Sequence, residues 1–145
     1  MHGRTFYDAV GDALTGFLPP SLRDFECYRS SYNLKLWYGT EGREHYEVQL
    51  IKHRRKVGLE IGFHAEHTDA DRNDAALDKL MSLEKRWRRK LGDEPEAGTF
   101  IGQQTKWRRI SEFWDGAVGG DDPELAIDAA QRLATYITVL EPLRK

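Results

Sequence analysis

The fold is decided by two stretches in which apolar and polar residues alternate, HYEVQLI at residues 45–51 and VGLEIGFH at residues 57–64. Their apolar members are Tyr46, Val48, Leu50, Val57, Leu59, Ile61 and Phe63. A strict period of two predicts strands that bury one face and leave the other polar. The basic segment 52–56 between them is short, so we expect an antiparallel hairpin with a charged tip.

The remaining periodic segments place more strands and three helices around this hairpin. Further strands are predicted at Phe25–Ser30, Tyr32–Tyr38, about Thr99–Gly102 and about Lys106–Trp114. Helices are predicted at Phe6–Phe17, at about Asp71–Leu91, and from Pro123 to about Leu140 with Asp122 as N-cap. The order α-ββββ-α-ββ-α predicts one α+β domain over residues 1–145. Its mainly antiparallel sheet has about five to six strands, with helices packed on one face.

Composition limits the class of protein. The chain has 145 residues, 32% of them charged, and a mean hydropathy of −0.69, and no apolar run approaches the ~20 residues of a membrane span. The first residues lack the apolar core of a signal peptide, so we expect a cytoplasmic protein without a membrane association. The single cysteine, Cys27, excludes a disulfide framework, and its alternation with Phe25 predicts a packed core thiol.

Four segments carry a resemblance to a known family. They are GLEIGFH at 58–64, WRRKLG at 87–92, KWRRI at 106–110 and AQRLATYI at 130–137. With the order of the elements, they resemble a small bacterial family of uncharacterised α/β domains, found alone or fused to predicted nuclease modules. The resemblance covers about the last two thirds of the chain. It implies no known activity and carries over no catalytic residue.

A candidate metal site follows the second alternating stretch. His64, His67 and Asp69 offer imidazole and carboxylate ligands that suit zinc or another divalent ion. Positions three apart on a strand point to opposite faces, so the two histidines converge only if the strand ends near His64. A metal-assisted hydrolase is the function that such a site indicates. Alternatively, His64 simply ends the strand and the acidic residues cap the next helix.

The polar face of the sheet provides a candidate interface. His45, Glu47, Glu60 and His64 share this face on neighbouring strands, where an acid–base pair would need a desolvated environment that the sequence does not supply. A solvated surface, or an interface between two copies of the domain, explains these residues more simply. Trp37 opposes the apolar alternation of its own strand, so we expect it on the same face, unless a bulge turns it inward. The predicted interface is therefore Trp37, His45, Glu47 and Glu60.

Two basic clusters surround tryptophans and suggest nucleic-acid binding. Arg88 and Arg89 follow Trp87, while Arg108 and Arg109 follow Trp107. Guanidinium groups can contact phosphates while aromatic rings stack on bases. The alternative is that these arginines form ion pairs with the acidic residues nearby. A net charge of −2 also differs from the basic total that is typical of nucleic-acid binders.

The motif search favours binding over catalysis. The sequence contains no Walker pattern, no Gly-x-Gly-x-x-Gly and no Gly-x-Ser-x-Gly, so we expect no cofactor. The leading hypothesis is a non-enzymatic binding or adaptor domain that acts as a homodimer and has a protein partner. The alternatives are a nucleic-acid-binding accessory of a nuclease or restriction-type system, and the metal-assisted hydrolase.

Overall fold

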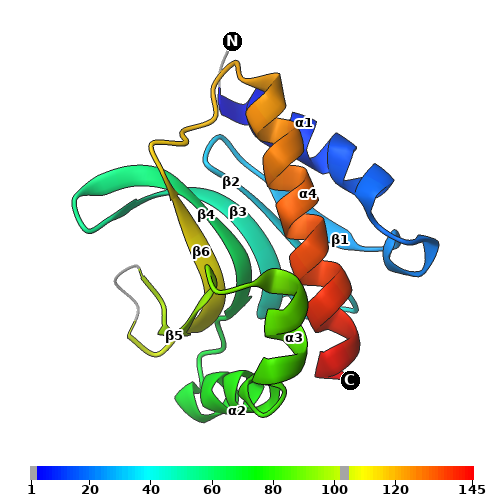
Figure 1. The fold of residues 1–145 in the computed structure, drawn as a ribbon, viewed down its shortest axis with the longest axis vertical. Coiled ribbons are helices and arrows are strands. Elements are labelled where there is room, and N and C mark those ends of the chain that lie inside the picture. Colours follow the sequence, from blue (N-terminus) through cyan, green and yellow to red (C-terminus); the bar gives the residue numbers. More distant parts are fainter. Residues whose placement is uncertain (1–2, 102–104) are drawn as a thin grey trace.

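The computed structural model describes residues 3–101 and 105–145 as an α+β domain (Figure 1), which confirms the predicted fold class. The helices are α1 (Gly3–Phe17), α2 (Ala70–Met81), α3 (Glu84–Leu91) and α4 (Pro123–Leu140), with short 3-10 turns at Pro20–Leu22 and Glu141–Arg144. The strands are β1 (Glu26–Arg29), β2 (Asn33–Trp37), β3 (Glu44–His53), β4 (Lys56–Ala65), β5 (Glu96–Thr99) and β6 (Arg108–Asp115). Every pairing in the sheet is antiparallel, in the order β1-β2-β3-β4-β6-β5.

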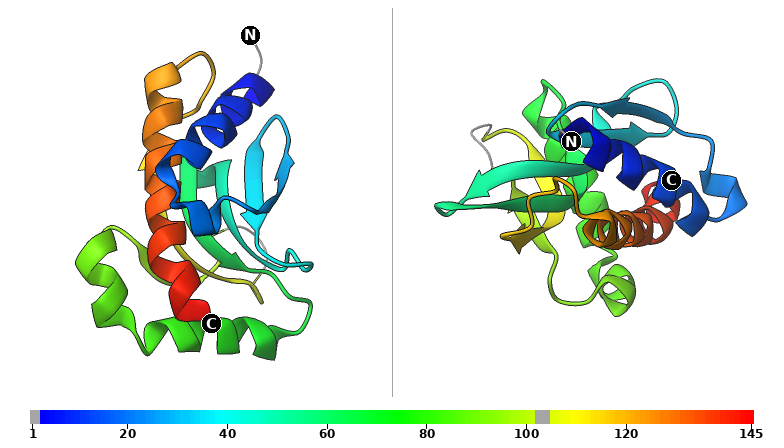
Figure 2. Two further views of the ribbon diagram at one scale, coloured as in Figure 1. Left: turned by 90° about the vertical axis from the view of Figure 1, so that its right-hand side faces the viewer. Right: turned by 90° about the horizontal axis from the view of Figure 1, so that it is seen from above.

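The hydrophobic core lies between the apolar face of the sheet and helices α1 and α4 (Figures 1 and 2). From β3 and β4 it receives the alternating residues Tyr46, Val48, Leu59, Ile61 and Phe63, each at most 1% exposed. From α4 it receives the predicted stripe Ala126, Ala130, Leu133, Ile137 and Leu140. Burial of each large apolar side chain contributes about 1.5–3 kcal/mol, so this face holds the helices on the sheet.

The predicted long helix 71–91 is wrong in one respect, because it breaks into α2 and α3 at Ser82 and Leu83. A straight helix of about 20 residues would continue in one direction for about 30 Å. Instead, α2 lies across one end of the sheet and α3 turns toward α4 (Figure 1). The break is stabilised by Trp87, whose indole N–H donates to the Leu80 carbonyl at 2.9 Å. Both side chains stay fully buried, so the apolar stripe survives the bend.

Two further predictions need correction at the margins of the sheet. Strand β5 starts three residues before the predicted Thr99–Gly102, and Gly102 itself lies outside the described residues. Cys27 is exposed, so the predicted core thiol is wrong. It lies on β1, one of the two edge strands, opposite Leu36 of β2, and no residue of β1 is buried. No helix among the described residues is long and apolar enough to cross a membrane.

Glycines in β4 allow the sheet to bend sharply. Gly58 and Gly62 belong to the polar side of β4, where a Cβ atom would lie 2.1 Å from the Trp114 carbonyl oxygen and 2.3 Å from that of Ile110. Strand β6 therefore approaches this side more closely than any side chain would permit. The bend, visible in β3 and β4 in Figure 1, turns the polar face inward instead of leaving it flat.

The close approach predicts that Gly62→Ala destabilises the protein by about 2 kcal/mol or more, since the methyl group must displace the β6 backbone. Gly62 also has φ +154°, which side chains rarely adopt. The control is Gly16→Ala in α1, where nothing lies within 4 Å and alanine favours the helix by about 0.5–1 kcal/mol. Urea unfolding of both variants measures the difference. Equal stability of the two variants would contradict the assigned role of Gly62.

Candidate metal centre

Two short motifs of the form His-x-Glu meet across the central pair of strands. His45 and Glu47 lie two residues apart on β3, so they share one face, and Glu66 follows directly after the last residue of β4, two positions beyond His64. The register places His45 directly opposite His64. Glu47 lies opposite Gly62. The four side chains therefore converge on the polar side of the sheet.

The four side chains offer one ligand atom each, and these atoms all lie within 4.8 Å of one another. Glu47 Oε1 lies 3.0 Å from both His45 Nε2 and His64 Nδ1. Glu66 Oε2 lies 3.1 Å from His64 Nδ1 and 3.6 Å from His45 Nε2. A tetrahedral zinc ion with bonds of about 2.0–2.1 Å separates its ligand atoms by about 3.3–3.4 Å. The four nitrogen–oxygen distances of 3.0–3.6 Å are close to this spacing, and the remaining pairs of donor atoms lie within 4.8 Å of one another.

The other polar atoms of these side chains are held from outside the cluster. The Nδ1 atom of His45 lies 2.9 Å from the Gly42 carbonyl oxygen, and Nε2 of His64 lies 2.8 Å from Glu60 Oε2. Glu47 Oε2 accepts from the Asn33 amide at 2.9 Å. If each ring donates through its outer nitrogen, the inner nitrogen keeps a lone pair directed at the centre. This is the arrangement by which histidine ligands of metals are oriented in proteins.

Glu60 is held by hydrogen bonds from neighbouring strands. Its carboxylate accepts hydrogen bonds from the Gln49 amide at 2.6 Å and from the Ser111 hydroxyl at 2.5 Å. Arg109 in turn donates to Ser111 Oγ at 2.9 Å. Strand β6 thereby helps to fix the orientation of His64 through Glu60, without contributing a ligand of its own.

The cluster is buried, which corrects the expectation of a solvated polar face. His45, Glu47 and Glu60 are at most 2% exposed and His64 is fully buried. The bent sheet encloses them, and the Phe100 ring packs edge-on against His64 with centroids 5.1 Å apart. Three of the four residues predicted as a dimer interface therefore have almost no surface to offer a second copy. The fourth, Trp37, is half-buried and lies next to Gly42 in the turn before β3.

Within the cluster, the pKa values of the carboxyl groups are lowered and the pKa of His64 is raised. Burial alone would raise the pKa of Glu47, but hydrogen bonds with His45 and His64 outweigh it and lower that pKa. Burial would also raise the pKa values of Glu60 and Glu66. Interactions with His64 outweigh it and lower both values. Burial opposes a charge on His64, but attraction to Glu60 and its hydrogen bonds raise its pKa well above the usual range.

The residues of the sequence-predicted metal site are not brought together. Of His64, His67 and Asp69, only His64 belongs to the cluster. The Nε2 atom of His67 pairs with Glu44 at 2.7 Å, and Asp69 caps α2 by accepting from the Asp71 N–H. The partners of His64 are instead Glu66, which directly follows β4, and His45 and Glu47 on β3.

Three of the four arginines predicted to contact nucleic acid are paired within the chain. Arg88 pairs with Glu84 at 2.7 Å, Arg108 with Asp74 at 2.9 Å and Arg109 with Glu96 at 2.9 Å. Arg89 is exposed. Trp87 lies in the core, where its ring cannot stack on a base, and the half-buried Trp107 packs edge-on against Phe100.

Comparison with known proteins found no match to any family model, curated protein or solved structure. The resemblance to a family of uncharacterised bacterial domains therefore stays a prediction, and the case for function depends on the site itself.

The pKa shifts predict how the stability of the metal-free protein depends on pH. The lowered pKa values of Glu47, Glu60 and Glu66 stabilise the fold above their usual value of about 4.3, and this stabilisation disappears as the pH falls. The raised pKa of His64 stabilises the fold fully below about 6.5, and this contribution is lost as the pH rises. Urea unfolding in a chelating buffer should therefore show greatest stability between about pH 4.5 and 6.5. A free energy of unfolding that stays constant from pH 6.5 to 9 would contradict the assignment for His64.

Proposed function

We propose that this chain is a binding domain for one divalent transition-metal ion, held by His45, Glu47, His64 and Glu66. The observation that carries the proposal is the convergence of two imidazole nitrogens and two carboxylate oxygens within 4.8 Å of one another, with nitrogen–oxygen distances of 3.0–3.6 Å and the outer atom of each ring already bonded. Chance pairing on a polar surface does not account for this, because all four side chains are buried.

The donor set favours zinc among the common ions. Two imidazoles and two carboxylates suit Zn²⁺ and its transition-metal neighbours, whereas Ca²⁺ and Mg²⁺ prefer oxygen alone and Cu⁺ prefers sulfur. The cluster also has charge to neutralise. With Glu60 it contains three carboxylates against at most two imidazolium charges, and Lys35 reaches only its edge, 3.6 Å from Glu66 Oε1. A divalent cation would replace protons as the source of positive charge.

The proposed role of the ion is to bind rather than to catalyse. Four protein donors complete a tetrahedral shell, as in structural zinc sites, whereas catalytic sites keep one position for water. Hydrolysis would therefore need Glu66 to give way to a water molecule. As long as all four residues bind, the ion fastens β3 to β4 at the centre of the sheet.

Protons compete with the ion for this site. The raised pKa of His64 means that its inner nitrogen, Nδ1, carries a proton at neutral pH before metal arrives. Because a metal ligand must be deprotonated, binding releases this proton while Nε2 keeps its bond to Glu60. Glu60 is thus a positioning residue, since it holds the ring in the orientation that turns Nδ1 to the ion.

The proposal predicts that purified protein, stripped with a chelator and dialysed against Zn²⁺, retains one ion per chain. His45→Gln should retain none, because glutamine cannot replace the imidazole nitrogen at the centre. His67→Gln is the matched control, since His67 is similarly buried but bonds to Glu44 outside the cluster. Elemental analysis gives the stoichiometry, and thermal unfolding should show stabilisation by about 2.7 kcal/mol at a free Zn²⁺ concentration of 100 times Kd.

Glu66→Gln is a second variant for the case in which His45→Gln does not fold. It removes a ligand charge at the most exposed of the four positions, and it should bind Zn²⁺ more weakly than the parent protein. Equal zinc retention by the parent, His45→Gln and His67→Gln would overturn the proposed site. So would a parent protein that retains no transition metal.

A further inference from the structure

The hairpin that joins β3 to β4 extends beyond the rest of the sheet. Strand β2 pairs with β3 only as far as Gln49, and β6 pairs with β4 only from Gly58 onward. Residues 51–57 therefore form a two-stranded projection, the hairpin arm, which stands clear of the helices in Figures 1 and 2.

The hairpin arm is strongly basic. Lys52, Arg54, Arg55 and Lys56 are all exposed. Within the described part of the chain only Lys56 has a carboxylate within 4.0 Å, at 3.3 Å from Asp115. The arm thus differs from the arginines near Trp87 and Trp107, which mostly have ion-pair partners.

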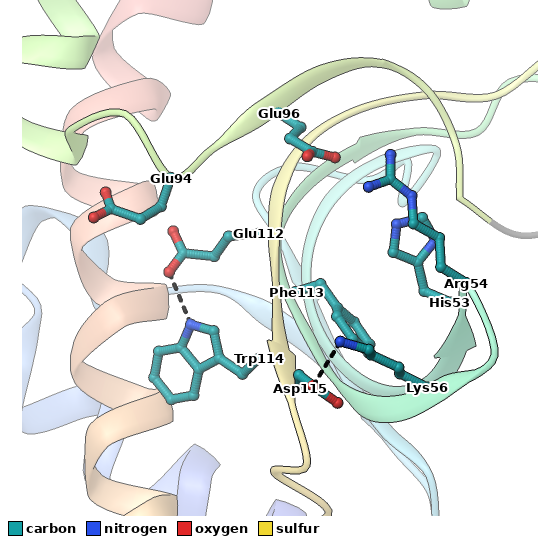
Figure 3. Close-up of a pocket in the computed structure, with 9 residues that line it drawn as sticks. All are labelled: His53, Arg54, Lys56, Glu94, Glu96, Glu112, Phe113, Trp114 and Asp115. Carbon is teal, nitrogen blue, oxygen red and sulfur yellow. Dashed lines mark hydrogen bonds and ion pairs between the residues drawn. The ribbon is translucent and has the colours of Figure 1, made fainter.

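Acidic residues in the cleft between the arm and β6 neutralise the arm only in part. The cleft has a volume of about 410 Å³ and contains Glu96 and Glu112 (Figure 3). These two carboxylates already pair with Arg109 and Arg132, at 2.9 Å and 2.7 Å. Figure 3 shows Arg54 on the same side of β6 as Glu96, but no ion pair joins them within 4.0 Å. Glu94 and Asp115 also line the cleft, whereas Lys52 and Arg55 have no carboxylate within 4.0 Å in the described part of the chain, so the arm keeps part of its positive charge available.

The two arginines at the tip of the arm have a strained backbone conformation. Arg54 and Arg55 have φ values of +52° and +68°, the conformation required at both central positions of a two-residue hairpin turn. Asn-Gly is the sequence that adopts this turn most readily. Next to the tip, His53 pairs with Lys56 and packs edge-on against Phe113 of β6 with centroids 5.4 Å apart, which holds the arm against β6.

We propose that the hairpin arm binds duplex DNA by entering the major groove, with Arg54, Arg55 and Lys52 contacting phosphates along its edges. The major groove of B-DNA is about 12 Å wide and admits a two-stranded β-ribbon. The corresponding groove of duplex RNA is deep and too narrow for protein side chains to read. The arm should therefore prefer duplex DNA to duplex RNA of the same sequence.

The arm offers a membrane surface little apolar area to bind. Val57 is its one largely exposed apolar side chain.

The test measures binding of a fluorescently labelled 20-base-pair DNA duplex by anisotropy, across a series of salt concentrations. The variant is Arg54→Asn with Arg55→Gly, which removes two charges and provides the favoured turn sequence, so that folding is preserved. We expect affinity at low salt to fall on the order of tenfold. The slope of log K against log salt should become shallower by about two.

The matched control is Lys85→Gln with Arg86→Gln, which removes the same charge from exposed positions on α3. It should bind DNA like the parent protein. The proposal is overturned if the parent does not bind DNA at low salt, or if both double variants weaken binding equally. It is also overturned if duplex RNA or vesicles of anionic lipid bind as tightly as DNA. None of these outcomes depends on the metal centre, because the assay is run with and without chelator.

Discussion

The antiparallel register that sets His45 opposite His64 is the constraint on which the structure of the site depends. A shift by one residue would move every side chain of one strand to the other face, placing histidines in the core and Tyr46 or Phe63 in the cluster. The same register therefore buries the apolar residues in the core and brings the polar residues together in the cluster. Contacts with α1 and α4 select the register, and the register then assembles the two His-x-Glu motifs.

Placing this cluster inside the chain is costly, and the cost argues for a function. Buried ion pairs contribute little net stability, and leaving one partner of such a pair alone typically costs about 3–5 kcal/mol. Apolar side chains would fill the same space without that risk. Carboxylates and histidines with strongly shifted pKa values cluster at functional sites. A divalent ion would satisfy the excess of negative charge that the two imidazoles leave.

The sequence predicted the sheet better than it predicted the site. Alternation at 45–51 and 57–64 correctly placed His45, Glu47, Glu60 and His64 on one face, and Asp122 with Pro123 located the start of the last helix. The missing component was desolvation, because it arises from the approach of β6 to Gly58 and Gly62 and from the Phe100 ring, which are contacts between distant segments. Glu66 was overlooked as a partner of His45, although the repeated His-x-Glu spacing was a signal that could have found it.

The coordination shell of the zinc-loaded protein tests this account most directly, by X-ray absorption at the zinc edge. We predict four nitrogen or oxygen neighbours at about 2.0–2.1 Å, with the outer scattering of two imidazole rings and no sulfur. A shell that lacks imidazole scattering, or one of six oxygen neighbours, would show that the ion binds elsewhere on the protein. That result would contradict the claim that the paired histidines of β3 and β4 form a metal centre.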